Sequence, residues 1–416
     1  MPLSDASAPE PAASARWLSI VGIGEDGVEG LSAAARGLIG AADVVFGGKR
    51  HLTLAASLIR GAARPWPSPF DGAASEVKQH RGRQICVLAS GDPFHYGIGA
   101  VLARSFDARE MTVVPAPSAF SLAAARLGWA LAETALLSVH GRNLDLVRPY
   151  LQPGARILAL TSDGNGPAAL AQLLTQLGFG ASRFTVLEAL GGLRERIRTT
   201  TAAQFDLDAV DTLNTLAIEV EAAADARVVA RACGLADHLF EHDGQLTKRE
   251  VRAVTVSSLA PRRGELLWDI GAGAGSVAIE WTLADPLFMR AIAIEQRSDR
   301  VARIHRNAAA CGVPGLEVVH GTAPAVLANL PPPHAIFVGG GAGEPGVLDA
   351  AIAALRSRGR LVVNAVTLQT EGSLIARHAA LGGELIRIAI ARVGAVGGKT
   401  GWRPAMPVTQ WLWTKP

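Results

Sequence analysis

The residues best suited to chemistry follow a hydrophobic stretch in the second half of the chain. Residues 266–270 (Leu-Leu-Trp-Asp-Ile) have the pattern of a buried strand, and Gly271, Gly273 and Gly275 alternate with alanine directly after it. A strand followed by a glycine loop and a helix places peptide N–H groups where a ligand can approach the backbone. Glu295 ends the next predicted strand, 20 residues beyond the loop. A carboxylate at that distance can accept hydrogen bonds from a ribose diol.

The spacing of the glycines indicates which cofactor this loop could serve. A dinucleotide site has the spacing G-x-G-x-x-G, whereas Gly275 follows Gly273 by two residues. That spacing is typical of the G-x-G-x-G loop of S-adenosyl-L-methionine (SAM) methyltransferases, and Ser276 then starts the helix. A glycine turn that binds nothing is the alternative. The strand, the helix and the acid at the expected distance favour a cofactor site.

Two later loops extend the same predicted site. Thr322 and Ala323 follow the third strand, where SAM methyltransferases commonly contact the adenine ring, although many carry an acid at the position of Thr322. Gly339 and Gly340 follow the fourth strand, where methyltransferases of nucleobases usually carry an Asn/Asp-Pro-Pro-aromatic motif. The glycines therefore argue against a nucleobase amine as the substrate.

The stretch before this unit contains two further patterns. Thr247 and Glu250 fit the Ser/Thr-x-x-Glu capping box, which predicts that Thr247 caps a helix and leaves open whether it also faces the cofactor. The acids and histidines of residues 237–243 could resemble metal ligands, but a zinc-type motif is lacking. We interpret them as a solvated helix end and expect no metal site.

The first half of the chain has its own set of loops. Beside a glycine turn at residues 22–27, loops at 89–97, 115–119, 140–142 and 160–167 each follow a predicted strand. Open α/β sheets bind ligands where such loops converge. A single Gly-Asp-Pro sequence is a common turn, but four such loops, each after a strand, predict a second site. The candidate cofactor-binding residues here are Gly22, Gly24, Gly91, Asp92, Pro93, Gly97, Ser118, Ala119 and Gly141.

Composition narrows the class of protein. Of 416 residues, 49% are hydrophobic and 45 are glycine, while aromatics make up only 5%, which favours α/β domains over a disordered chain or an aromatic RNA-binding platform. The net charge of +3 comes without a long basic run, so we expect no nucleic acid partner. Three distant cysteines exclude a disulfide framework and suggest a cytoplasmic protein. The most apolar stretch, residues 119–137, contains Arg126 and Glu133, so we expect no membrane span.

Two α/β patterns must position these loops. In each, strands alternate with helices, which predicts mainly parallel sheets with crossover helices. The predicted strands cover residues 17–21, 43–46, 84–89, 112–114, 135–138, 156–160, 185–190, 216–220, 265–270, 290–294, 316–319, 335–338 and 360–365, with further strands at the C-terminus. Length alone allows about two to three domains, and the motifs reduce this to two. We predict a disordered tail over 1–15 and domains over 16–224 and 225–416.

Together these residues resemble the family of precorrin-6B C(5,15)-methyltransferases (decarboxylating), bifunctional enzymes of cobalamin (vitamin B12) biosynthesis. Residues 21–24, 91–94 and 117–119 are similar to the tetrapyrrole methyltransferase (class III) fold. Thr247, the glycine loop, Glu295 and the loops at 321–324 and 339–341 are similar to its Rossmann-like class I partner. The resemblance covers nearly the whole chain from about residue 16.

The resemblance implies one SAM per domain, a small-molecule tetrapyrrole substrate and a homo-oligomer such as a tetramer. By analogy the N-terminal domain methylates carbon 5, and the C-terminal domain methylates carbon 15 and removes the carbon 12 acetate carboxyl group, giving precorrin-8. Asp92 is the candidate base, with a structural turn as the rival role. Arg392, Lys399 and Arg403 could hold substrate carboxylates, or be incidental charges of a solvated loop.

Three alternatives stay open at the level of sequence. One is a fused SAM methyltransferase that acts on RNA or another small metabolite. A second has one active domain and an N-terminal domain that only binds tetrapyrrole. A third, an NAD-dependent dehydrogenase, is disfavoured by the loop spacing.

Overall fold

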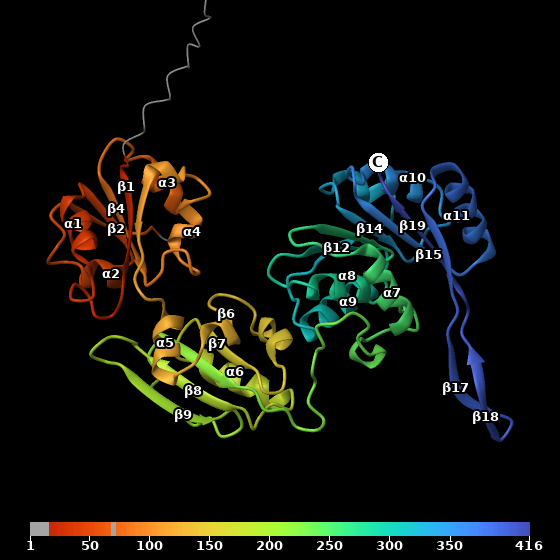
Figure 1. The fold of residues 1–416 in the computed structure, drawn as a ribbon, viewed down its shortest axis with the longest axis horizontal. Helices are drawn as coiled ribbons and strands as arrows, with labels where there is room; N and C mark the ends of the chain where they lie inside the picture. The colour runs from red at the N-terminus through yellow and green to blue at the C-terminus, as the bar shows by residue number, and fades with distance from the viewer. Residues whose placement is uncertain (1–15, 68–71) are drawn as a thin grey trace, which may run out of the picture. The chain divides into compact units, whose positions relative to one another are not determined.

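The computed structural model describes residues 16–67 and 72–416 (Figure 1). The described residues divide into two compact units, one formed by those up to residue 142 together with 153–226, and the other by residues 143–152 and 227–416. The tail predicted for residues 1–15 lies outside the described residues. Among the helices of the described part, none is long and apolar enough to cross a membrane.

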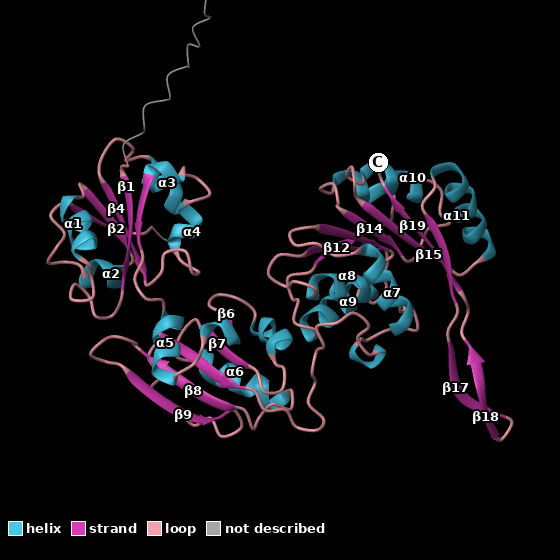
Figure 2. Cartoon of the chain, in the orientation of Figure 1, coloured by secondary structure: helices cyan, strands magenta, loops and turns pink. Residues whose placement is uncertain are grey.

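The first unit starts with a five-stranded sheet in which all neighbours are parallel, in the order β3-β2-β4-β1-β5. Neighbouring residues of β1 belong to separate cores, Ile20 to one and Val21 to the other, because helices cover both faces. Figure 2 shows α1 and α2 beside one face and α3 and α4 beside the other. The bounds are β1 Leu18–Ile23, α1 Ala33–Ala41, β2 Val44–Gly47, α2 Lys49–Leu54, β3 Ala62–Pro65, α3 Ala73–Lys78, β4 Ile85–Ser90, α4 Ile98–Leu102 and β5 Met111–Val114.

The same unit contains a second sheet, in the order β6-β7-β10-β8-β9, and here the prediction of a mainly parallel sheet is wrong. Only β6 and β7 are parallel; the other three pairs are antiparallel. The link from β8 to β9 is too short for a crossover, which needs a dozen or more residues. The bounds are α5 Ala119–Leu127, β6 Thr134–Ser138, β7 Arg156–Leu160, α6 Gly166–Gln176, β8 Arg183–Glu188, β9 Arg196–Thr201 and β10 Asn214–Glu219.

Two strands of this unit, β3 and β9, were not predicted from the sequence. All four residues of β3 are exposed, and β9 consists of arginine, isoleucine and threonine with little burial. Strands without an apolar face lack the period-two pattern on which sequence prediction depends. Both lie at sheet edges, where pairing on one side is enough to order them.

The second unit is built on a seven-stranded sheet in the order β13-β12-β11-β14-β15-β19-β16. The strands β11 to β15 are parallel to one another, and β19 is antiparallel to β15 and β16. The strand order reverses between β11 and β14, which is where open α/β sheets bind ligands. The bounds are β11 Leu266–Ile270, β12 Arg290–Glu295, β13 Glu317–His320, β14 Ala335–Val338, β15 Arg360–Ala365, β16 Glu384–Ile388 and β19 Val408–Thr414.

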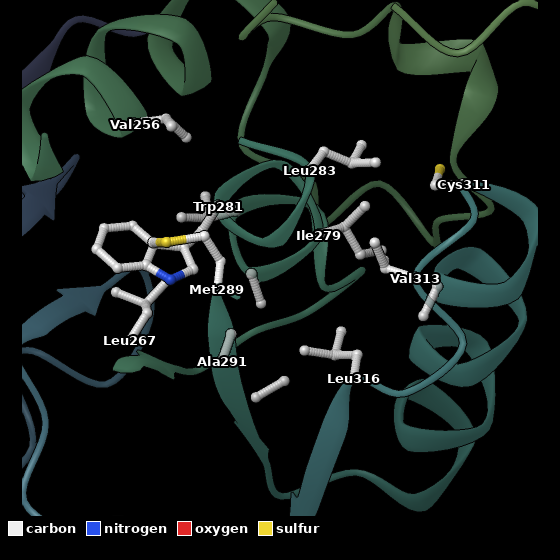
Figure 3. Close-up of a cluster of buried hydrophobic side chains, with 14 of the residues drawn as sticks. Val256, Leu267, Ile279, Trp281, Leu283, Met289, Ala291, Cys311, Val313 and Leu316 are labelled. Carbon is white, nitrogen blue, oxygen red and sulfur yellow. The ribbon is translucent and has the colours of Figure 1, made fainter. Parts of the chain in front are cut away.

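Helices cover both faces of this sheet. Leu267 of β11 lies in the core under α7, α8 and α9, part of which is drawn in Figure 3, and Trp268 lies in the core under α10 and α11. Because side chains alternate along a strand, Asp269 points to the same face as Leu267. The helices are α7 Arg249–Leu259, α8 Ser276–Leu283, α9 Ser298–Ala310, α10 Val347–Ala354 and α11 Leu368–Leu381.

A separate ribbon leaves this sheet between β16 and β19. Its strands, β17 (Ala391–Val396) and β18 (Lys399–Pro404), pair with each other in an antiparallel ladder (Figure 1). Val393 and Trp402 on this ribbon are largely exposed.

Candidate active site

A cavity of about 810 Å³ opens at the carboxyl ends of β11, β12 and β14, the point where the strand order reverses. It brings together most of the residues predicted for the second unit. Those on its lining are Thr247, Gly271, Gly273, Glu295, Thr322, Ala323, Gly339, Gly340 and Arg392. Gly275, Ser276, Lys399 and Arg403 are not on the lining.

Gly271 makes the sharp turn from β11 into the cavity. Its φ is +71°, and a Cβ added there would lie 2.7 Å from the carbonyl oxygen of Gly340. Backbone and steric limits therefore both require glycine at the floor of the cavity. Gly275 also has a positive φ, +75°, and its added Cβ would lie 2.8 Å from the side chain of Ile304 in α9. Ser276 is buried as the first residue of α8.

Glu295 is the acid predicted to meet a ribose. Its Oε2 accepts a hydrogen bond from the Gly273 N–H at 2.9 Å, and its Oε1 accepts one from the Arg297 N–H at 3.0 Å. The side chain is buried at the end of β12, on the cavity lining. These two backbone donors hold the carboxylate still, and each oxygen retains a lone pair that can accept a hydroxyl.

Asp269 is a residue of this cavity that sequence reasoning missed. Its Oδ2 accepts a hydrogen bond from the Ala278 N–H at 3.0 Å, whereas its buried Oδ1 has no hydrogen-bond partner among the described residues. Burial, opposed by the Ala278 hydrogen bond and aided by the charge of Glu295, raises the pKa of Asp269 to about 7. The signal was an acid inside an otherwise apolar strand, directly before the glycine loop. Such a carboxylate is suited to a positively charged ligand.

The capping-box prediction for Thr247 is wrong. The N-cap of α7 is Lys248, which makes no side-chain capping bond. Thr247 lies on the cavity lining, and its carbonyl oxygen accepts a 2.5 Å hydrogen bond from Arg252. A buried arginine thus determines where the chain turns into α7, a contact that a local pattern does not reveal.

The charged residues before α7 form ion pairs. Asp243 pairs with Arg300 at 2.9 Å, and Asp237 pairs with Arg252 at 3.2 Å. Among the described residues we find no group of three or more acids, histidines and cysteines that could hold a metal ion.

The three basic residues predicted to hold substrate carboxylates differ in position. Arg392 lies on the cavity lining at the base of the ribbon and pairs with Glu250 of α7. Arg403 faces Arg392 in the register of the ribbon, and Lys399 starts β18 at its far end. All three are exposed.

In the first unit, the glycine turn after β1 and the predicted loops after β4 and β5 meet at the carboxyl edge of the parallel sheet. The predicted loops at 140–142 and 160–167 follow β6 and β7 of the other sheet, so the four loops do not end one sheet as expected. A Cβ at Gly22 would lie 1.9 Å from the Gly91 carbonyl oxygen, and one at Gly91 would lie 2.8 Å from the Pro117 carbonyl oxygen. The Ala116 N–H donates to Gly91 at 3.2 Å. Three loops from β1, β4 and β5 are thus packed backbone against backbone, which leaves no room for side chains at the two glycines.

The other predicted residues of this unit form turns and helix starts in or near those loops. Asp92 Oδ1 accepts from the Phe94 N–H at 2.8 Å, an Asx turn that also positions Pro93. Gly97 is the N-cap of α4, Ser118 caps α5 by accepting from the Ser121 N–H, and Ala119 is the first residue of α5. Gly141 follows β6; its N–H donates to Ser162, and the neighbouring Arg142 lies over the ring of Tyr96 in the Asp92 loop. Gly24 lies in the turn after β1.

A charged cluster beside these loops was not predicted. Arg50 pairs with Glu25 and donates to Ser90 Oγ at 2.9 Å, and the His51 ring lies 2.8 Å from the same oxygen. Burial, with a smaller contribution from Arg50, lowers the pKa of His51 to about 4, so this ring is neutral at pH 7. Glu25 follows β1, Arg50 and His51 lie in α2, and Ser90 ends β4, so the residues are far apart in sequence and no local spacing connects them.

The comparisons with known proteins cover both units. Residues 18–206 match a family of tetrapyrrole (corrin/porphyrin) methylases, and residues 238–415 match a precorrin methyltransferase domain. A curated precorrin-6Y C(5,15)-methyltransferase (decarboxylating) from Sinorhizobium sp is 61% identical over 413 residues, which are 99% of this chain and 100% of the relative.

Two shorter relatives each match less than half of the chain. A probable cobalt-precorrin-6B C(15)-methyltransferase (decarboxylating) from Pyrobaculum calidifontis is 37% identical over 181 residues, 42% of this chain and 92% of the relative. A cobalt-precorrin-7 C(5)-methyltransferase from Salmonella typhimurium is 30% identical over 208 residues, 46% of this chain and 96% of the relative.

Proposed function

The chain belongs to the family of precorrin-6Y C(5,15)-methyltransferases (decarboxylating), and on that premise we propose that it methylates precorrin-6B at carbons 5 and 15 and removes the carboxyl group of the carbon 12 acetate, giving precorrin-8 in cobalamin biosynthesis. It is a SAM-dependent methyltransferase in which a tetrapyrrole methylase fold precedes a Rossmann-like class I fold. The observation that carries the proposal is the pairing, in one chain, of a tetrapyrrole methylase domain with a precorrin methyltransferase domain.

The direct test is mass spectrometry of the product formed by the full chain from precorrin-6B and SAM. We expect two added methyl groups and the loss of one carbon dioxide. Recovery of the substrate unchanged, or methylation without loss of carbon dioxide, would contradict the proposal.

The chemistry of the cavity in the second unit suits SAM. The unpartnered Oδ1 of Asp269 suits a cationic amino acid moiety, and Glu295 suits a ribose diol. Thr322 and Ala323 lie on the lining, where an adenine ring would lie in this fold. SAM supplies a methyl group bound to a positively charged sulfur. The residues around it need to orient the ligands and exclude water, and no strong base is required of them.

For the first unit we propose a second SAM site, formed by the loops around Gly22, Gly91 and Ser118. Support comes from the close packing of these three loops at one edge of a parallel sheet. Calorimetric titration with S-adenosylhomocysteine should then give two sites per chain. One site per chain would instead support an N-terminal unit that binds tetrapyrrole without methylating it.

The raised pKa of Asp269 predicts a pH dependence of ligand binding in the second unit. An ammonium group beside Asp269 favours its ionised form, so binding must release the proton that Asp269 holds below a pH of about 7. We expect release of up to about one proton per ligand at pH 6, and an affinity that rises with pH until about pH 7 and then levels off. Calorimetry in buffers of different ionisation enthalpy measures this release.

Asp269→Asn is the control for this measurement, because the amide has no proton to lose. It should bind S-adenosylhomocysteine in the second unit without releasing a proton. If the unaltered chain also releases none at pH 6, the role given to Asp269 is wrong. The folding stability of the ligand-free unit depends on pH with the opposite sign to ligand affinity. Because folding raises the pKa of Asp269, the contribution of this group to the unfolding free energy falls as pH rises through about 7.

We further propose that Asp92 removes a proton during methylation of carbon 5. It lies after β4, in the loop that contacts the β1 and β5 loops, and only its Oδ1 is engaged with Phe94. Asp92→Asn preserves the Asx turn, because an amide oxygen can still accept from Phe94.

This variant should release a decarboxylated product with one added methyl group, and the rate of carbon 5 methylation should fall at least about a hundredfold, the usual scale for a general base. The measurement is mass spectrometry of the product mixture. A normal yield of doubly methylated product would leave Asp92 with its structural role alone.

The division of labour between the domains is also a proposal. Residues 16–224 would methylate carbon 5, and residues 225–416 would methylate carbon 15 and decarboxylate. It is supported by the two half-length relatives, whose names assign these reactions to separate proteins.

For substrate carboxylates we propose Arg392 within the cavity, with Lys399 and Arg403 serving carboxylates that extend along the ribbon. Arg392→Glu would place two acids together, since Arg392 pairs with Glu250. We expect the KM for the tetrapyrrole to rise at least about tenfold, with a smaller rise for Lys399→Glu and Arg403→Glu, because screening weakens exposed charges. Steady-state kinetics of the three variants measures these KM values. Equal KM values for all three variants and the unaltered chain would overturn the assignment.

The resemblance to this family also leads us to propose a homo-oligomer, a tetramer by analogy. Light scattering after size-exclusion chromatography measures the mass, and the mass of a single chain would contradict it.

A further inference from the structure

A chain of buried hydrogen bonds runs from α7 across β19 to the wall of the cavity in the second unit. Ser258 Oγ donates to Gln410 Oε1 at 2.9 Å, and Gln410 Nε2 donates to Asn364 Oδ1 at 2.9 Å and to Thr255 Oγ1 at 3.2 Å. Asn364 Nδ2 donates to Thr255 Oγ1 at 3.0 Å. The Thr255 hydroxyl gives its proton to the Val251 carbonyl at 2.8 Å.

The direction of each bond in this chain is determined by its neighbours. Because Thr255 spends its only proton on Val251, it must accept from both amides, so each amide turns its NH2 group toward Thr255. Gln410 and Thr255 are fully buried, whereas Asn364 lies on the cavity lining. Asn364 uses one of its two amide protons on Thr255, which leaves one N–H for a ligand. The network thus holds a neutral donor in a fixed orientation at the wall.

The wall beside Asn364 is apolar. Asn364 of β15 is opposite Gln410 of β19 in the sheet. Val408 lies two residues from Gln410 along β19, on the same face, and is opposite Ile388 of β16. The apolar sector of the lining that lies around this row consists of Val366, Ile388, Ile390, Met406 and Val408. Arg392 lies two residues beyond Ile390, at the base of the ribbon, and is assigned above to another carboxylate of the substrate. A carboxylate in this sector would meet a neutral donor and hydrocarbon.

We propose that Asn364 donates this hydrogen bond to the acetate carboxylate that is lost, with Thr255 and Gln410 as positioning residues. This inference rests on the proposed function and names the place in the cavity where decarboxylation occurs. Loss of carbon dioxide disperses the negative charge of the carboxylate. A cation or water would stabilise that charge most before the reaction, whereas a single neutral donor orients the group without holding its charge so strongly.

The electrons of this step balance without an oxidant or a further reactant. Carbon 15 forms a bond to the methyl group with an electron pair of the macrocycle, the sulfur–methyl bond breaks, and the macrocycle becomes positively charged. The bond between the acetate methylene and its carboxylate then breaks, and the electron pair neutralises the macrocycle as carbon dioxide leaves. The exocyclic methylene takes up a proton while the macrocycle gives one up.

The test uses the full chain with three substitutions. Asn364→Asp removes the donor and adds a charge, Asn364→Leu removes the donor alone, and Thr255→Val removes the acceptor that orients Asn364. We expect the rate of carbon dioxide loss to fall at least about tenfold in both Asn364 variants, and by less in Thr255→Val. The affinity for S-adenosylhomocysteine should stay within about twofold, since the donor serves the substrate.

Thr282→Val is the matched control. Thr282 is also buried and donates to the carbonyl four residues earlier, Ala278, at 2.9 Å, but it belongs neither to the network nor to the lining. It should leave the products unchanged. Normal loss of carbon dioxide in Asn364→Leu, or an S-adenosylhomocysteine affinity that falls with activity, would overturn the inference. Failure of the proposed function can be distinguished from failure of this inference, because in that case even the unaltered chain would release no decarboxylated product.

Discussion

Gly271→Ala should weaken binding of S-adenosylhomocysteine at the second unit at least about a hundredfold, which corresponds to about 2.7 kcal/mol. Two causes add. An alanine with a φ of +71° is strained by about 1–2 kcal/mol, and its Cβ would lie 2.7 Å from the Gly340 carbonyl oxygen. The contacted atom is a backbone oxygen in a tight loop, so the Gly340 loop must shift to admit the Cβ. The Gly271 loop and the Gly340 loop both line the cavity, so the shift changes the shape of the binding site. Calorimetry should register one site per chain instead of two.

The matched control is Gly264→Ala. Gly264 also has a positive φ, +85°, but an added Cβ there meets nothing within 4 Å, and it is not on the cavity lining. This variant carries the backbone strain without the collision and should keep both sites. The Gly271 variant should also release no decarboxylated product, because we assign that step to the second unit. Unchanged binding in Gly271→Ala would show that the cofactor does not lie over this loop.

Glu280→Ala should cost the second unit about 3–5 kcal/mol of unfolding free energy, the usual result of breaking a buried ion pair. Glu280 accepts from Arg252 Nε at 2.5 Å and from the N–H groups of Gly234 and Leu235 at 2.7 and 2.8 Å. Arg252 is fully buried, and without Glu280 its remaining acidic partner among the described residues is Asp237 at 3.2 Å, so its charge would be poorly compensated away from solvent. Denaturant unfolding followed by tryptophan fluorescence measures the change, since Trp268 and Trp281 are buried in this unit.

Glu241→Ala provides the comparison, because Glu241 also pairs with one arginine, Arg306, at 2.8 Å. Both of those side chains are more than half exposed, at 57% and 55%, so solvent screens the pair and its loss should cost less than about 1 kcal/mol. We also expect Glu280→Ala to weaken S-adenosylhomocysteine binding, since Arg252 holds the Thr247 carbonyl at the cavity. Equal stability losses in the two variants would contradict this account.

Much of the second site could be predicted because its residues lie in short patterns. The strand β11, the loop at Gly271 and the acid Glu295 occupy a single strand–loop–helix–strand unit, where spacing along the chain determines position in space. Asp269 lies inside the same pattern, but the sequence does not identify it as a binding residue. An acid in an apolar strand indicates a ligand only once its burial and its unpartnered oxygen are known.

Other features depend on residues that are distant in sequence. Thr247 was expected to cap α7, yet its carbonyl is held by Arg252, whose own position depends on Glu280 in another helix. The chain of hydrogen bonds to Asn364 joins α7 to β15 and β19. Its partners are set by the β15–β19 register, which a single sequence does not contain.

By itself the sequence determined that this chain has two α/β units, glycine loops at the ends of parallel strands, and the family to which both units belong. Local steric limits and hydrophobic periodicity carry the information on the units and loops, whereas the family follows from the resemblance of the motifs in both halves. Tertiary structure alone decided that the second sheet of the first unit is mainly antiparallel, that Arg392 reaches the cavity while Lys399 and Arg403 do not line it, and that Asp269 holds its proton to about pH 7. These properties depend on strand pairing, burial and the charges nearby, which arise only when distant parts of the chain pack together.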